Sequence, residues 1–125
     1  MSQVHHFNGD KQVFSWAHVV CEELHEEGLE SVYKSVLIGE KENAPNFIMR
    51  YFQVGAQGHS RLERHPQEHE IIILHGKGVV QIGEENYEIK PFDVVFIEGN
   101  ELHQFRNPFQ ENLGFICIIP NSSKS

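Results

Sequence analysis

The most informative stretch of the chain reads Glu63-Arg64-His65-Pro66-Gln67-Glu68-His69-Glu70 and runs directly into Ile71-Ile72-Ile73-Leu74. It sets two imidazoles four residues apart among carboxylates, ahead of a short apolar run rich in β-branched side chains. Such a run, followed by His75-Gly76, is typical of a buried β-strand. The stretch therefore leads from a cluster of candidate ligands into a strand.

Similar short runs recur on both sides of this stretch, separated by Gly, Pro, Asn and Asp. The predicted strands are Ser31 to Ile38, Phe47 to Val54, Glu70 to Leu74, Val79 to Ile82, Tyr87 to Ile89, Val94 to Ile97, His103 to Arg106 and Leu113 to Ile119. Gly83-Glu84-Glu85-Asn86 predicts a hairpin, and residues Trp16 to Glu27 predict a short helix or turn that ends at Gly28. Short strands with close turns predict an all-β antiparallel barrel or a double-sheet jelly roll.

The size and charge of the chain narrow its class. Its 125 residues suffice for one domain, which needs no disulfide or metal simply to fold. A net charge of −8 without a basic run argues against nucleic acid and anionic membrane surfaces as partners. No apolar stretch is long enough to span a membrane, and no export signal is visible. Cys21 and Cys117 are therefore expected to be reduced in the cytoplasm.

Histidine is abundant, with nine residues in the chain. On a strand, Glu63 and His65 point to one face, and a bend at Pro66 can return His69 to that face. His103 begins another predicted strand. Three imidazoles and one carboxylate that converge inside a barrel would bind a divalent transition metal, with the carboxylate favouring Mn or Fe over Zn, Ni or Cu. Most histidines are surface or core residues, so spacing alone does not establish this site.

The same residues match a second pattern. His65-Pro66-Gln67-Glu68-His69 has the form H-x-x-E-H of inverted zinc peptidases. That motif requires a helix, whereas the β-branched residues that follow favour a strand. The peptidase interpretation is therefore the weaker one.

Two segments together resemble the two motifs of the cupin family. They are Glu63 to Gly78 and the pair Pro91 to Ile97 with His103 to Asn107, and small manganese-binding cupins with H-x-H-P-x-E-H-E are the most similar type. The resemblance implies a double-stranded β-helix, the cupin jelly roll, over about residues 31–120. Residues 1–30 would be an N-terminal arm or edge segment, and 121–125 a flexible tail. It also implies a homodimer.

Carried over by position, the resemblance makes His65, His69 and His103 metal ligands. Glu63 replaces the first histidine of the motif, and it is expected either to bind the metal or to serve as a general base; Glu70 is a competing carboxylate. Phe92 stands where the second motif has glycine, which suggests an altered turn within an intact barrel.

Four further residues are candidates for the substrate pocket. Phe105 shares the face of His103 by alternation. Cys117 matches a position near the metal in cupins, although a small core residue is an equal alternative. Arg50 either binds an anionic substrate or lies at the rim or in solvent, and Gln67 replaces a tryptophan common in cupins. His59 and His75 adjoin glycines and are expected to be exposed.

These residues predict one divalent metal per chain and a small-molecule ligand. The leading hypothesis is a dioxygenase-like, metal-dependent oxidoreductase. A metal-dependent isomerase or epimerase and a non-catalytic ligand or metal sensor remain as alternatives, because a fold does not determine a function.

Overall fold

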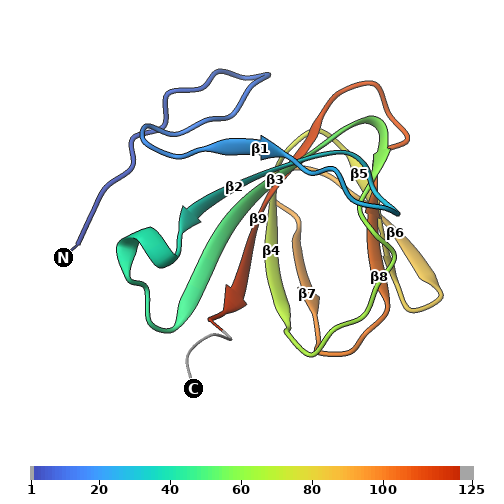
Figure 1. Cartoon of the computed structure of the whole chain (residues 1–125). Coiled ribbons are helices and arrows are strands. Elements are labelled where there is room, and N and C mark those ends of the chain that lie inside the picture. The colour runs from blue at the N-terminus through green and yellow to red at the C-terminus, as the bar shows by residue number, and fades with distance from the viewer. Residues whose placement is uncertain (1, 122–125) are drawn as a thin grey trace.

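The computed structural model describes residues 2–121 and consists of one strongly curled sheet (Figure 1). The strands are β1 (Cys21–Glu23), β2 (Glu30–Ile38), β3 (Phe47–His59), β4 (His69–His75), β5 (Gly78–Ile82), β6 (Glu85–Ile89), β7 (Val94–Ile97), β8 (His103–Arg106) and β9 (Leu113–Pro120). Each expected strand is present, which confirms the all-β jelly-roll prediction. The tail residues 122–125, expected to be flexible, lie outside the described residues.

The sheet closes into a barrel because β3 bends. Along most of its length β3 pairs with β2 and β9, and at its end His59 pairs with Arg106 of β8. The strand order is β6-β5-β8-β3-β9-β4-β7, with β2 beside β3 and β1 beside β2. In Figure 1, β4 and β7 therefore lie opposite β5, β6 and β8. Apolar side chains of both halves point inward and form the core, which includes Val54, Ile73, Val80, Ile97 and Leu113.

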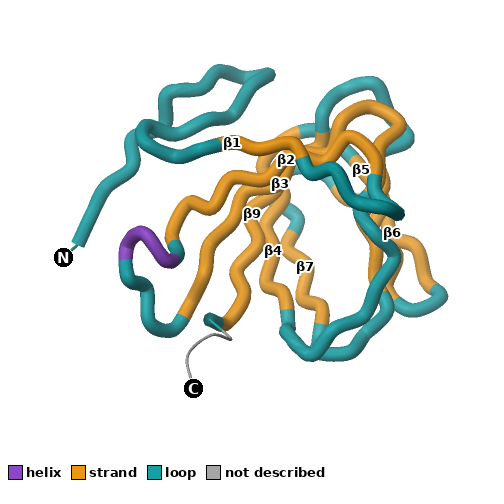
Figure 2. The backbone as a smooth tube through the Cα atoms, in the orientation of Figure 1, coloured by secondary structure: helices purple, strands orange, loops and turns teal. Residues whose placement is uncertain are grey.

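The region between Trp16 and Glu27 leads into the predicted turn, at Glu27 and Gly28, but contains no helix. Instead of a short helix it contains β1, whose three residues are exposed and pair with Tyr33 to Ser35 of β2. The only helical element in residues 2–121 is η1 (Glu40–Glu42), a 3-10 turn between β2 and β3 (Figure 2). No described helix has the length and hydropathy to cross a membrane.

The N-terminal arm covers part of the outer face of the sheet. Phe7 pairs with Trp16 across a loop, and Phe14 stacks on Tyr51 and lies 4.2 Å from the His75 ring, measured between centroids. The hydroxyl of Tyr51 hydrogen-bonds to Nε2 of His75. The expectation that His75 is exposed is thus wrong, because the arm covers it.

The turn at Phe92 keeps a glycine-like backbone. Phe92 adopts a φ of 75°, and the turn is closed by hydrogen bonds between Lys90 and Asp93. Pro91 before it fits a turn of the type that requires a positive φ at the next position. The barrel is intact, as expected. The turn, however, is not altered in the expected way, because Phe92 adopts the positive φ that a glycine would have at this position.

Candidate metal centre

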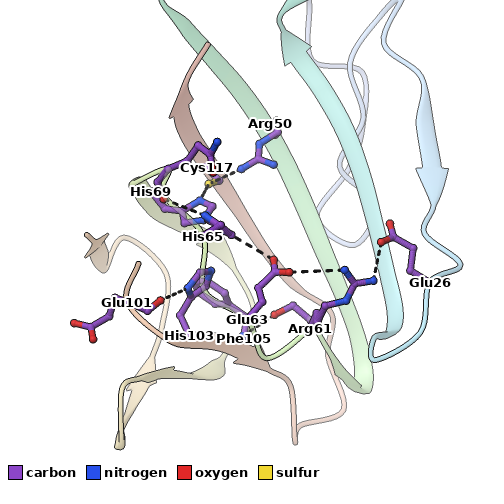
Figure 3. Close-up of polar contacts among 12 residues, drawn as sticks. Glu26, Arg50, Arg61, Glu63, His65, His69, Glu101, His103, Phe105 and Cys117 are labelled. Atoms are coloured by element: carbon purple, nitrogen blue, oxygen red, sulfur yellow. Dashed lines mark hydrogen bonds and ion pairs between the residues drawn. The ribbon is translucent and has the colours of Figure 1, made fainter. Parts of the chain in front are cut away.

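Three segments bring His65, His69 and His103 together at one end of the barrel interior. His69 begins β4 and His103 begins β8, whereas His65 lies in the segment that leads into β4. That segment is fixed by two backbone hydrogen bonds between Glu63 and His103, of 3.1 and 2.9 Å. The ligand atoms of the three imidazoles lie within 4.8 Å of one another (Figure 3). They are the only such group of three found in residues 2–121.

In each imidazole, Nδ1 is the nitrogen that points away from the other two rings, and it has a hydrogen-bond partner. Nδ1 of His65 lies 3.1 Å from the carbonyl oxygen of Gln67, and Nδ1 of His103 lies 2.8 Å from that of Glu101. A carbonyl only accepts, so both Nδ1 atoms carry the proton when the rings are neutral. Their Nε2 atoms are then left with a free lone pair, which is the state that binds a metal.

The Nδ1 partner of His69 is a thiol instead of a carbonyl, but its Nε2 also faces the other imidazoles. Its Nδ1 lies 3.0 Å from Sγ of Cys117, and its Nε2 lies 2.9 Å from Nε2 of His65. At this spacing the Nε2 atoms of His65 and His69 could both bind one divalent ion. Burial, followed by the nearby His103, His65 and Arg50, lowers the pKa of His69 to about 3. The ring is therefore neutral at physiological pH, and the three residues could hold a metal ion.

Glu63 lies beside these imidazoles but outside their group. One carboxylate oxygen is 3.9 Å from Nε2 of His65 and the other is 3.9 Å from Nη1 of Arg61, as Figure 3 shows. The side chain is 39% exposed and lines the same cavity. Glu70, the competing carboxylate, is exposed and follows His69 on β4, so it points to the opposite face.

A cavity of about 200 Å³ opens beside the imidazoles. Phe105, Cys117 and Arg50, all candidates from the sequence, line it, whereas Gln67 is not among the lining residues. Burial raises the pKa of the Cys117 thiol, with Arg50 acting in the opposite direction. The lining thus combines apolar side chains, such as Phe105, with charged side chains, such as Arg50 and Glu63.

The sequence interpretation did not single out Lys34, Phe52 or Arg61, which also line the cavity. Lys34 could have been found, since alternation places it between Val32 and Val36 on one face of the predicted strand. Arg61 could not, because its position depends on Glu26, which accepts a hydrogen bond of 2.8 Å from it across a long separation in sequence.

Comparison with known proteins agrees with this architecture. A family model described as the cupin domain matches residues 50–119. A 1-methylthio-D-xylulose 5-phosphate methylsulfurylase from Rhodospirillum rubrum is 46% identical over 71 residues, which are 57% of this chain and 46% of that protein. The matched part of the chain thus spans less than half the length of this curated relative.

Solved structures extend the similarity to almost the whole chain. A cupin-2 domain protein from Rhodospirillum rubrum is 37% identical, with a TM-score of 0.82 over 92% of this chain and 78% of that chain. A cupin 2 conserved barrel protein from Rhodopseudomonas palustris is 27% identical, with a TM-score of 0.84 over 95% of this chain and 81% of that one. Since the family match covers more than half of its residues, the chain belongs to the cupin family.

Proposed function

We propose that this cupin is a metal-dependent enzyme that transforms a small carbonyl compound, with an ion held by His65, His69 and His103. The observation that carries the proposal is that the site holds two kinds of group, namely imidazoles that can bind a metal and a carboxylate outside their group that can accept a proton. Three imidazoles converge, while the carboxylate of Glu63 lines the same cavity beside them. A bound divalent ion would polarise a substrate oxygen.

The residues of the chain would supply the remaining chemistry. Glu63 is half-exposed and faces the cavity, so its carboxylate can take a proton from a substrate carbon or hydroxyl next to the carbonyl. Phe105 and Phe115 stack at 4.4 Å between centroids and restrict water at the apolar wall. The relative named as a methylsulfurylase acts on a ketose phosphate derivative, and this supports a carbonyl substrate.

A dioxygenase-like oxidoreductase is the second candidate. It is supported by the ligand set, because three imidazoles leave several positions of a redox metal open to O₂ and substrate. Fe is the metal we propose in either case, because imidazole ligands suit Fe, Zn, Ni and Cu and Fe supports both candidates. Mn remains an alternative if Glu63 also binds the ion, because a carboxylate ligand favours Mn.

The decisive experiment combines elemental analysis with activity assays. Untagged protein should contain near one equivalent of metal, and His65→Ala, His69→Ala and His103→Ala should each lose it. His25→Ala is the matched control, because the His25 side chain is 78% exposed and is not among those that line the cavity. Turnover of 1-methylthio-D-xylulose 5-phosphate or of a simpler hydroxyketone without O₂ consumption supports the first candidate, and substrate-dependent O₂ uptake supports the second.

Two other outcomes would contradict both candidates. Bound metal without turnover of any compound would indicate the non-catalytic sensor. Absence of metal after supply of Mn, Fe and Zn would remove the enzyme proposal altogether.

We also propose that the protein acts in the cytoplasm as a homodimer. The homodimer is supported by an exposed apolar strip on the outer face of β4 and β7. In this strip Val94 is 75% exposed, and Phe96 and Ile72 flank it. Burial of such side chains against a second copy would stabilise the assembly. Light scattering after size-exclusion chromatography should give twice the mass of 14.4 kDa.

A further inference from the structure

Two cations face the cavity without a carboxylate partner. Arg50 on β3 and Lys34 on β2 both line it, and neither forms an ion pair with a carboxylate among residues 2–121. Arg61, the third cation of the lining, differs because Glu26 neutralises it at 2.8 Å. The unpaired positive charge is thus confined to one wall.

Arg50 uses few of its hydrogen-bond donors. Its Nη2 donates to Sγ of Cys117 at 3.2 Å, and its guanidinium carbon lies 4.9 Å from the centroid of the Phe52 ring. Its Nε–H is buried and has no hydrogen-bond partner among the described residues. A buried N–H of a charged group without an acceptor is costly, and native structures keep few of them. A ligand that brings an acceptor would remove this cost.

The strand register places Lys34 on the same wall. Lys34 pairs with Phe52, and Arg50 is two residues before Phe52 on β3, so the three side chains point to one face of the sheet. Side chains in such diagonal positions have Cβ atoms roughly 7 Å apart, within reach of long side chains. A single oxyanion can therefore contact both cations.

This wall is also close to the imidazoles. Cys117 contacts Arg50 through Sγ and contacts His69 through the same atom, at 3.2 and 3.0 Å (Figure 3). An anion that accepts from Nε of Arg50 would thus belong to a short molecule, whose other end reaches the three histidines. The apolar rings of Phe52 and Phe115, 5.7 Å apart between centroids, line the same space.

We propose that Arg50 and Lys34 form a binding subsite for an anionic group of the substrate, either a phosphate monoester or a carboxylate. Arg50 supplies directed donors and Lys34 supplies a mobile charge. The assignment of this anion to the substrate rests on the proposed function, but the subsite itself is testable without turnover. It makes the substrate class a small anionic carbonyl compound.

The test follows the Arg50 Nε–H by NMR. The chain has four arginines, so their side-chain Nε–H signals can be assigned from Arg50→Lys and the corresponding variants. Metal-loaded protein containing diamagnetic Zn²⁺ and metal-free full-length protein are each titrated with inorganic phosphate and, separately, with acetate. The Arg50 signal should move downfield and saturate with the preferred anion, while the Arg61 signal moves little.

Variants then separate local binding from net charge. Arg50→Gln should weaken binding of the preferred anion at least tenfold and Lys34→Gln about threefold or more, measured by calorimetry. Lys77→Gln, which removes one exposed charge outside the cavity, should change the dissociation constant less than twofold. If Arg50→Gln does not fold, Arg50→Lys replaces it, and loss of the directed donors should still weaken binding.

The outcomes are distinguishable from failure of the proposed function. Preference for phosphate identifies a phosphate monoester, and preference for acetate identifies a carboxylate; both support the subsite. Anion binding that is absent, or that is equal in Arg50→Gln and Lys77→Gln, would overturn it even if the histidines bind metal. Saturable anion binding in protein that takes up no metal would retain the subsite and reject the metal-dependent enzyme.

Discussion

Cys117 supports His69 from behind: its Sγ lies 3.0 Å from Nδ1 of the imidazole, on the side opposite the Nε2 that faces the other histidines. The thiol is 2% exposed and is fixed by the pairing of Cys117 with both Arg50 and Ile71. A buried group in this position restricts rotation of the ring, in the way that outer partners of metal-binding histidines do.

The first prediction concerns this support. Cys117→Ala should reduce metal affinity about tenfold, because His69 loses the partner that orients it. Cys117→Ser should retain affinity within about threefold, since a hydroxyl can replace the thiol as partner. Competition with a chromogenic chelator measures both, and Cys21→Ala at the exposed cysteine is the matched control. Unchanged affinity in Cys117→Ala would refute the role.

The second prediction separates the two roles expected of Glu63. Glu63→Gln should keep near one equivalent of metal, because the carboxylate lies outside the group of three imidazoles. Turnover should fall about a hundredfold or more, since the amide cannot accept the proton. Metal content and single-turnover rates are measured on the same preparation. Loss of metal would show instead that Glu63 is a ligand.

The third prediction is a pH dependence of stability in the metal-free protein. The pKa of His69 falls from 6.5 to about 3 on folding, chiefly through burial, so the unfolded chain binds a proton that the folded chain does not. Stability is then complete above pH 6.5 and is lost progressively as the pH falls toward 3. Between about pH 7.5 and pH 5 we expect a loss of about 1 kcal/mol from this residue, after allowance for solvent screening.

Urea denaturation at several pH values measures this loss. His69→Asn should show a shallower pH dependence over the same range, whereas His25→Asn should keep that of the wild type. A slope that is equal in wild type and His69→Asn would contradict the assignment. His75, whose pKa is also lowered by burial, adds to the slope in the same direction in all three proteins.

The fourth prediction concerns the turn at Phe92. The residue is 77% exposed and has a φ of 75°, which costs an L-residue roughly 1–2 kcal/mol and costs glycine little. Relief of this strain is partly offset by the entropy that glycine adds to the unfolded chain. Phe92→Gly should therefore raise the free energy of unfolding by a net amount of about 1 kcal/mol. Phe92→Ala keeps the strain and should gain much less; equal effects of both variants would exclude the backbone explanation.

Local pattern was sufficient for most of the barrel. The strand at Ile71 to Ile73 and the hairpin at Gly83 follow from β-branched runs and a turn residue, and both are present. β1 was missed because Cys21, Glu22 and Glu23 are all exposed, so no alternation marks them. Their conformation depends on pairing with β2, which is not a property of the local sequence.

The same distinction applies to the site. The spacing of His65 and His69 and the position of His103 indicated the imidazole group in advance. The sequence did not reveal that Glu63 interacts with Arg61, since closeness in sequence does not determine which partner a flexible side chain contacts. It also left Arg50 undecided, because its contact with Cys117 depends on the register between β3 and β9.

The residues that line the cavity come from separate parts of the chain. The imidazoles come from residues 65–103, whereas Lys34 and Phe52 come from β2 and β3 and share no hydrogen bond or ring contact with them among the described residues. Substitutions at these two positions can thus alter which molecules enter without removing a metal-binding imidazole or its hydrogen-bond partner. A combinatorial library at Lys34 and Phe52, screened at constant metal content, would explore how readily this scaffold acquires new substrates.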